Sequence, residues 1–226
     1  INLPSRLYTH RTVYRVFNNG SFDQGGRFYG GWWQQIPSGL RKHITIDGQW
    51  TIELDYSALH PRLIYAERGK EYEGDPYDVG LDQSLRPPVK VTFQKLINGV
   101  GYPRQPRPGS GEPPFDAVEI GMSWRQFVDT IKDHHSSISD LFGTGIGLRL
   151  QRKDSDIAQA VMLEFNMFGA VMLPVHDSFI VGGFDLGFLQ SAMGKSMEKH
   201  SGIKVPIKET ELNASFSHLY TGLDTH

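Results

Sequence analysis

The 226-residue sequence contains no cysteine. Disulfide bonds and thiolate metal sites are therefore excluded, which fits a reducing interior. The sequence also lacks any apolar run of the roughly 18–20 residues that would span a bilayer, and no basic-then-apolar leader opens it. These absences predict a cytoplasmic, non-secreted protein without a membrane partner.

Net charge is also small, at −2, but it is unevenly distributed. Residues 1–43 carry six Lys/Arg against one acidic residue, whereas residues 44–83 carry three against nine. A basic region beside an acidic one suits contact with phosphates next to a metal-loaded centre, because affinity for phosphate is largely electrostatic. A random distribution of surface charge is the plain alternative.

The content of 38% apolar and 12% aromatic residues is typical of a folded globular protein. A hairpin is predicted where two alternating runs, 43–46 and 50–54, flank Asp47-Gly48. Ser123 and Gln126 form a capping-box signature at the start of a helix. The mixture of elements predicts an α+β fold. The other expected elements are helices over 5–18, 58–68, 89–98, 123–135, 154–168 and 186–200, and strands over 170–176, 178–183 and 203–209.

Two carboxylates, Asp55 and Asp177, lie at the ends of strand-like stretches. A two-metal phosphoryl-transfer site needs such a pair to hold ions about 3.5–4 Å apart, which activate the attacking oxygen and hold the leaving one. Magnesium prefers hard oxygen ligands and keeps waters and substrate phosphates in its shell, so two aspartates can suffice. The pattern predicts nucleotidyl transfer with two Mg²⁺ ions, for which Mn²⁺ can substitute.

Several motifs occur in the order found in the A-family DNA polymerases and the related single-subunit RNA polymerases. Residues 55–62 (D-Y-S-A-L-H-P-R) resemble the first catalytic motif, D-Y-S-x-I-E-L-R. Residues 86–99 carry R-x3-K-x7-N-G, similar to the fingers-helix motif R-x3-K-x7-Y-G, and residues 74–77 resemble the stretch that precedes it. Residues 150–157 and 175–179 (V-H-D-S-F) are similar to the last two segments of the family pattern.

Two upstream stretches extend the resemblance. Residues 22–29 resemble the RNA-polymerase segment D-F-R-G-R-x-Y, and residues 35–38 are similar to Q-N-I-P of the DNA polymerases. Each motif alone is weak, but their common order over residues 20–210 is strong. The resemblance implies a right-hand palm, with an antiparallel sheet and packed helices, plus a short helical fingers insertion, in a compact form that lacks thumb and exonuclease. The implied parts are a basic N-terminal segment (1–19), a palm in two pieces (20–62 and 150–226) and a fingers insertion (63–149).

The resemblance also implies roles for individual residues. Asp55, Asp177 and Lys90 would be catalytic, and Asp55, Asp177 and the backbone carbonyl of Tyr56 would bind metal. Nucleotide binding would fall to Arg86, Lys90, Gln94, Asn98 and His60. Contact with nucleic acid would fall to Arg27, Arg62, Gln151 and His176. Independently of the resemblance, Arg86, Lys90, Gln94 and Asn98 recur every four residues and so share one face of a helix.

The chain departs from the family where substrate choice is made. His60 replaces the glutamate that acts as a steric gate against ribose, and Gln94 and Asn98 replace an aromatic or Met and a Tyr. Ser178 follows Asp177 where DNA polymerases usually have Glu. Selectivity between deoxynucleotides and ribonucleotides therefore cannot be carried over from the family.

Three functional hypotheses follow. The favoured one is a DNA-directed DNA polymerase that extends a primer 3′-hydroxyl on a primer-template with nucleoside triphosphates. The runner-up is a single-subunit-type RNA polymerase or primase-like enzyme, and the third is a non-catalytic, nucleic-acid-binding polymerase remnant. A compact chain would depend on a helper protein or on missing domains for thumb function.

Three other features have simpler interpretations. His134-His135 is interpreted as a pair of solvated helix-end residues in preference to a metal site. Trp32-Trp33 could stack on bases or pack against the protein, with equal weight. The glycine-rich residues 143–147 are interpreted as a loop that returns from fingers to palm, because no Lys-Ser/Thr follows them.

Overall fold

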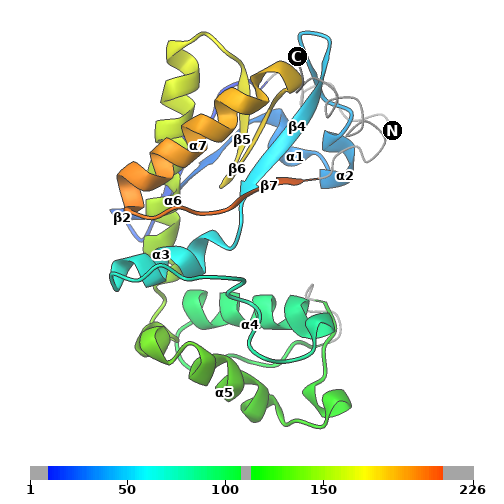
Figure 1. The fold of residues 1–226 in the computed structure, drawn as a ribbon, viewed down its shortest axis with the longest axis vertical. Helices are drawn as coiled ribbons and strands as arrows, with labels where there is room; N and C mark the ends of the chain where they lie inside the picture. The colour runs from blue at the N-terminus through cyan, green and yellow to red at the C-terminus, as the bar shows by residue number, and fades with distance from the viewer. Residues whose placement is uncertain (1–9, 108–112, 211–226) are drawn as a thin grey trace, which may run out of the picture. The chain divides into compact units, whose positions relative to one another are not determined.

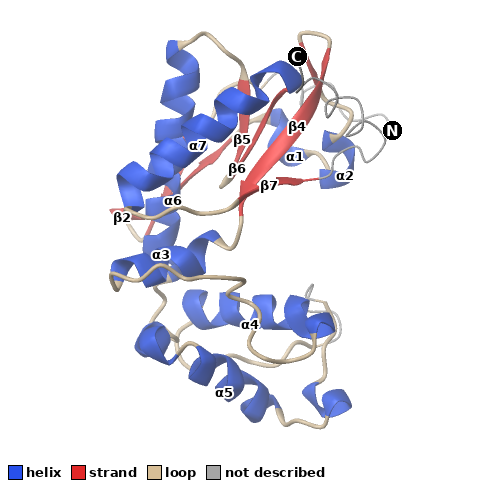
Figure 2. Ribbon diagram, in the orientation of Figure 1, coloured by secondary structure: helices blue, strands red, loops and turns tan. Residues whose placement is uncertain are grey.

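The structure, a computed structural model, describes residues 10–107 and 113–210, and the chain divides into two compact units. Unit 1 comprises Ile1–Leu59 and Arg152–His226, and unit 2 comprises His60–Gln151. Within the described residues all named strands belong to unit 1 (Figure 2). The α+β class is confirmed. The assignment of palm and fingers to the predicted segments stays a prediction.

Unit 1 is built on an antiparallel sheet in the order β3-β4-β6-β5, with β7 also paired to β4. Its strands are β3 (Thr45–Ile46), β4 (Gln49–Tyr56), β5 (Met172–Val175), β6 (Ser178–Gly182) and β7 (Ile207–Thr210). β6 lies along one side of β4, while β3 pairs with the start and β7 with the end of its other side. The predicted β3–β4 hairpin is confirmed, and both residues of its turn, Asp47 and Gly48, have positive φ.

Helices cover both faces of this sheet. α7 (Leu186–Ser201) lies across one face (Figure 1), where the Tyr56 hydroxyl donates to the Met193 carbonyl at 2.8 Å. On the other face, Ile180 packs with Ile44, Ile36 and Trp33 of α1 (Trp32–Gln35), beside the short α2 (Ser38–Arg41). Trp33 is buried and its indole donates to the Pro174 carbonyl at 2.8 Å, so this tryptophan packs in the core and does not stack on bases.

A second, two-stranded sheet corrects the helix predicted over residues 5–18. Within the described residues that segment forms β1 (Tyr14–Asn18), which pairs with β2 (Ser21–Tyr29), while residues 5–9 lie outside the described residues. The turn is Asn19-Gly20, with φ of 53° and 65°, and such a two-residue turn matches the twist of paired strands. Asn19-Gly20 between two apolar stretches is itself a hairpin signal.

Four longer helices complete the described chain: α3 (Leu59–Glu67), α4 (Arg86–Asn98), α5 (Trp124–His134) and α6 (Gly147–Met167). Short 3₁₀ turns lie at Gln83–Leu85 (η2), Ala117–Ile120 (η3), Ser136–Leu141 (η4) and Gly183–Asp185 (η5). The capping box of Ser123 and Gln126 is confirmed at the start of α5. α6 begins seven residues earlier than predicted, at 147 and not 154, so Gln151 lies within the helix. None of the described helices is both long and apolar enough to cross a membrane.

The core of unit 2 contains a histidine that the sequence analysis placed in solvent. His135, at the end of α5, is fully buried, whereas its neighbour His134 is exposed. Its Nε2 faces the Pro76 carbonyl oxygen at 2.9 Å, and its Nδ1 lies 2.9 Å from the Tyr65 hydroxyl. The solvated interpretation is therefore wrong for His135, because the chain turns it inward between α3 and the segment that contains Pro76.

Candidate active site

The sheet of unit 1 brings the two aspartates to one end of adjacent strands. Asp55 of β4 pairs with Ser178 of β6, and Asp177 immediately precedes Ser178 in the two-residue turn between β5 and β6. Residues that face each other on antiparallel strands have Cα atoms about 4.5–5.5 Å apart. Asp55 and Asp177, which are far apart in the sequence, therefore lie at the same end of the sheet, offset from each other by one residue.

Each of these strand ends contains a non-glycine residue in the left-handed region. His176 has φ 58° in the turn before Asp177, and Ala58 has φ 51° shortly after Asp55. Such a conformation costs on the order of 1–3 kcal/mol, and residues of this kind gather at functional sites. The strain fixes the direction in which the chain leaves each carboxylate.

A lysine that sequence reasoning missed lies beside Asp55. Lys208 is opposite Asp55 in the β4–β7 pairing, and its Nζ lies 3.7 Å from the Asp55 carboxylate. The sequence predicts the terminal strand but not its register, and register decides which side chain is opposite Asp55. Asp55 is therefore flanked by Ser178 on one strand and by a cation on the other.

A buried carboxylate lies on the same strand as Asp55. Glu53 is 5% exposed and accepts a hydrogen bond of 2.6 Å from the Ser178 hydroxyl. Arg41 lies nearby, with Nη1 3.7 Å from the same Glu53 oxygen. Ser178 thus links the strand that follows Asp177 to the strand that bears Asp55, a contact that spacing alone does not predict.

The donor set of this sheet end suits a hard divalent cation. Asp55 and Asp177 supply carboxylate oxygens, and both side chains are partly exposed. Within residues 10–107 and 113–210, no group of three or more His, Cys, Asp or Glu side chains could hold a metal ion. Ions bound here would have to take further ligands from backbone carbonyls, water and substrate phosphates, as magnesium commonly does.

Arg27 is held by a glycine bulge and an acidic partner. The β1–β2 pairing shifts register near Gly25 and Gly26, both of which have positive φ. Gly26 has φ 84°, a conformation that favours glycine, and a Cβ there would lie 2.8 Å from Arg15 Nη2 and would displace that side chain. Beyond it, Arg27 donates to Asp154 through Nη2 at 2.7 Å and Nε at 3.2 Å. Burial lowers the Arg27 pKa, but Asp154 more than offsets this and the net pKa is raised.

His176 is partly buried beside this arginine. Its ring makes an edge contact with Tyr29, with centroids 5.3 Å apart. Burial lowers the pKa of His176, and the nearby charge of Arg27 lowers it further. The imidazole is therefore held in its neutral form, which can both donate and accept a hydrogen bond.

In unit 2, α4 presents four of the five predicted nucleotide-binding residues, Arg86, Lys90, Gln94 and Asn98, on one face. The adjoining face, which contains Val89 and Phe93, is buried, whereas Lys90 and Asn98 are exposed and Arg86 and Gln94 are partly exposed. The Asn98 amide donates to the Gln94 carbonyl at 2.8 Å. Arg86 lies at the first residue of the helix, where the two following prolines are tolerated.

Arg86 is paired with an acidic residue. Its Nε donates to Asp75 Oδ2 and its Nη2 lies 3.3 Å from Asp75 Oδ1. Its guanidinium also stands 5.3 Å from the centre of the Tyr77 ring. Asp75 and Tyr77 belong to the stretch that precedes the helix, for which the sequence analysis gave no role.

Three of the predicted site residues are buried or partly buried. Arg62 is only 6% exposed, and its guanidinium donates to the Tyr72 and Gly74 carbonyls at 2.6 and 2.5 Å. Contact between Arg62 and nucleic acid would require this buried side chain to leave both carbonyls. His60 is also buried, and Gln151 is partly buried in α6. Their predicted contacts stay predictions.

The architecture matches a solved structure over most of its length. It is similar to the POL domain of Pol1 from M. smegmatis, determined in complex with DNA primer-template and dNTP, with a TM-score of 0.57. The fold is polymerase-like. The match covers 88% of this chain at 13% identity and 46% of that chain, so this protein spans about half of the solved polypeptide. No protein-family model and no curated protein matches the sequence.

Within the polymerase-like fold, the residues that sequence reasoning missed are partners of those it found. Lys208 lies against Asp55, Glu53 holds Ser178, and Asp75 holds Arg86. The sequence contains only a partial signal for each of these three residues, because strand register or the path of a loop determines which side chains they contact. Of these three partners, Asp75 was the easiest to predict, because residues 74–77 already stood out in the sequence.

Proposed function

We propose that this protein is a template-directed nucleotidyltransferase, a DNA-directed DNA polymerase that extends a primer 3′-hydroxyl. The observation that carries the proposal is that Asp55, at the end of β4, and Asp177, in the turn that enters the adjacent antiparallel strand β6, lie at one end of the sheet. The similarity to a polymerase domain solved with primer-template and dNTP supports it at the level of fold. The preference for DNA rests on residues 55–57 and on the match at Arg62.

The proposal gives each unit a task. In unit 1, Asp55, Asp177 and the Tyr56 carbonyl hold Mg²⁺, which when bound supplies charge stabilisation and activates the primer hydroxyl. In unit 2, Arg86 and Lys90 bind the incoming triphosphate and offset the charge that develops on transfer. The side chain of Lys90 is exposed and makes no ion pair or hydrogen bond to another described residue, so its ammonium is available to a ligand.

The remaining predicted residues have subsidiary roles. Gln94, Asn98 and His60 contribute to the nucleotide site, with the sugar tested by a set of side chains that differs from the family pattern. Arg27, Arg62, Gln151 and His176 contribute to the hold on nucleic acid, and for Arg62 that contribution acts through the segment that it fastens. A helper protein or further domains would supply the thumb function.

A primer-extension assay tests the proposal. Primed template is incubated with Mg²⁺ or Mn²⁺ and with deoxynucleotides or ribonucleotides supplied separately. Extension with deoxynucleotides is the expected result. Extension with ribonucleotides alone would establish the RNA polymerase alternative, which the sequence His176-Asp177-Ser178 favours. Binding of DNA without any extension would establish a non-catalytic remnant.

The variant Asp177→Asn tests the role of the aspartates. It keeps the shape of the side chain and removes its charge, so we expect extension to fall by at least about a hundredfold. Asp47→Asn is the matched control, because Asp47 is exposed in the β3–β4 turn and asparagine also tolerates its positive φ. Undiminished extension by Asp177→Asn would refute the two-metal assignment.

A further inference from the structure

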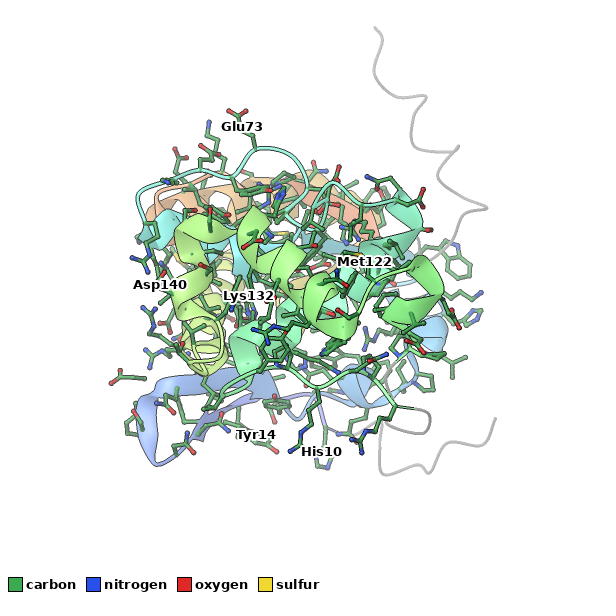
Figure 3. The ribbon with its side chains drawn as sticks, turned by 90° about the horizontal axis from the view of Figure 1, so that it is seen from below. His10, Tyr14, Glu73, Met122, Lys132 and Asp140 are labelled. Atoms are coloured by element: carbon green, nitrogen blue, oxygen red, sulfur yellow. The ribbon has the colours of Figure 1, made fainter. Side chains whose placement is uncertain are left out.

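The short segment of residues 70–77 in unit 2 is fastened to its surroundings from several sides. Arg62 donates to the carbonyls of Tyr72 and Gly74, and buried His135 contacts the carbonyl of Pro76. Between these anchors the exposed side chain of Glu73 points away from the unit (Figure 3). These bonds hold backbone oxygens on both sides of Asp75, so the position of its carboxylate is set by the fold.

The side chain of Asp75 is also fixed by hydrogen bonds of its own. One of its oxygens, Oδ1, accepts a hydrogen bond of 3.1 Å from the Tyr77 backbone N–H. The same oxygen lies 3.3 Å from Arg86 Nη2, while Oδ2 accepts from Arg86 Nε. The carboxylate therefore meets the guanidinium along one edge, with both oxygens engaged.

This edge contact leaves a defined part of Arg86 for a ligand. A guanidinium has five N–H donors in a planar fork, and the pair with Asp75 uses one on Nε and one on Nη2. The two donors of Nη1 and the outer donor of Nη2 remain, and together they match two oxygens of a phosphate. The ring of Tyr77, 5.3 Å from the guanidinium carbon, fixes the plane. Arg86 and Asp75 are 38% and 35% exposed, so the pair is open to a ligand.

We propose that Asp75 is the positioning residue for Arg86, which it orients so that the Nη1/Nη2 end of the guanidinium receives the phosphates of the incoming nucleotide. The inference rests on the proposed function, in which Arg86 binds the triphosphate. It assigns Asp75 an indirect role, because its own negative charge would repel a phosphate. Two opposite effects are thus possible for the pair, orientation of the arginine or masking of its charge, and they predict opposite results.

The variant Asp75→Asn separates orientation from masking. Asparagine can still accept from the Tyr77 N–H, so the segment keeps its turn, but the two-bond ion pair with Arg86 is lost. We expect the KM for the nucleotide in primer extension to rise about three- to tenfold, with kcat changed by less than about twofold, because a partly exposed charged hydrogen bond has a moderate effect. A fall in KM would mean that Asp75 masks Arg86, and an unchanged KM would mean that it does neither, so both results would overturn the inference.

Two further variants show whether Asp75 acts through Arg86. In an Arg86→Ala background, Asp75→Asn should raise KM by less than about twofold, because residues that act as a unit have non-additive effects. A full additional rise would overturn the inference. Asp78→Asn is the matched control from the same stretch of chain, since among the described residues the Asp78 side chain accepts only from the Gly80 N–H of its own turn and from Gln83. Thermal unfolding of each variant separates loss of fold from loss of binding.

Binding of inorganic tripolyphosphate, measured by calorimetry on the whole chain, separates this inference from the proposed function. If the wild-type protein extends no primer with either nucleotide class, the proposed function fails and the titration alone decides. Weaker binding by Asp75→Asn and by Arg86→Ala than by wild type would then support the orienting role. Equal or tighter binding by Asp75→Asn, or no binding by wild type, would overturn it.

Discussion

At the scale of single residues, the link between Glu53 and Ser178 shows how a buried charge supports the sheet end. Glu53 is almost fully buried, and the Ser178 hydroxyl donates to it at 2.6 Å. A carboxyl group in such a place needs hydrogen bonds, because burial of a polar group without them costs about 2–7 kcal/mol. Ser178, which follows Asp177, therefore has a structural partner one strand away.

Replacement of Ser178 by alanine tests this link. We expect Ser178→Ala to lower the free energy of unfolding by about 1–3 kcal/mol, since it leaves a buried acceptor with one bond fewer. Glu53→Gln is the matched variant, because glutamine still accepts from Ser178, and we expect a smaller loss. Denaturant unfolding followed by circular dichroism measures both. Equal stability of Ser178→Ala and wild type would contradict the link.

Candidate site residues could be predicted from the sequence where a motif marks them. The residues that they contact in the fold could not. Asp55 and Asp177 stand out in the sequence because each lies in a short, ordered pattern, and the structure brings them to the same end of the sheet, Asp55 on β4 and Asp177 in the turn before β6. Lys208 was missed because a shift of one residue in the β4–β7 pairing would put a different side chain beside Asp55. Arg62 stood out through its motif. Its burial could not be predicted, because that burial depends on a loop ten residues further along the chain.

At the scale of elements, the contacts of His135 join three parts of unit 2. The ring links the Tyr65 hydroxyl of α3, the Pro76 carbonyl of the preceding segment and the end of α5. Because Nε2 faces a carbonyl oxygen, it must carry the hydrogen, and Nδ1 accepts from the tyrosine. Protonation of Nδ1 would replace an acceptor with a donor and disturb this junction.

The pKa of His135 makes stability depend on pH. Burial lowers it from the ordinary 6.5 to about 4, and the neighbouring His134 acts in the same direction. Between pH 6.5 and 4 the unfolded chain therefore binds more protons at this residue than the native one. The free energy of unfolding should fall as pH drops through this window, by up to ~3 kcal/mol. The His135 contribution is fully present above pH 6.5.

Urea unfolding at pH 7 and pH 4.5 measures this effect. The matched comparison is His134→Gln, which removes the exposed neighbour and should keep most of the pH dependence. His135→Gln should be less stable at pH 7 and should lose that part of the pH dependence. A wild-type stability that does not change between the two pH values would contradict the prediction.

Elements with a local signal were predicted correctly, and those with two competing signals were not. The capping box and the Asp-Gly turn each fix a few neighbouring residues, so α5 and the β3–β4 hairpin needed no tertiary information. The basic residues before Asn19 suggested a helix, but Tyr14, Val16 and Phe17 favour a strand once a partner lies beside them. The start of α6 was missed because the glycine-rich stretch before it conceals the helix boundary.

At the scale of the whole molecule, charge pairing changes what the sequence suggests about nucleic-acid binding. Of the basic residues in the described part of segment 1–43, Arg15 and Arg27 pair with Asp156 and Asp154, and Arg41 lies near Glu53. Three of the five basic residues in the described part of this segment are therefore matched by acids from elsewhere in unit 1.

We therefore expect a shallow salt dependence for binding to primer-template. With about two phosphates neutralised, affinity should fall about tenfold between 50 and 200 mM salt, whereas five would give several hundredfold. Fluorescence anisotropy with labelled primer-template across this range measures the slope. A slope that requires five or more phosphate contacts would show that the paired arginines exchange their acidic partners for phosphate.

The pairing of β4 with both β6 and β7 has a consequence for how the chain acquires its structure during synthesis. Unit 2 is one continuous stretch, His60–Gln151, whereas unit 1 needs residues from both sides of it. β4 is synthesised together with its hairpin partner β3, but β6 and β7 follow more than a hundred residues later, and loop closure of that length makes their pairing slow. In the interval β4 has open edges of the kind that invite aggregation. The strand that carries Asp55 is thus made early and completed late.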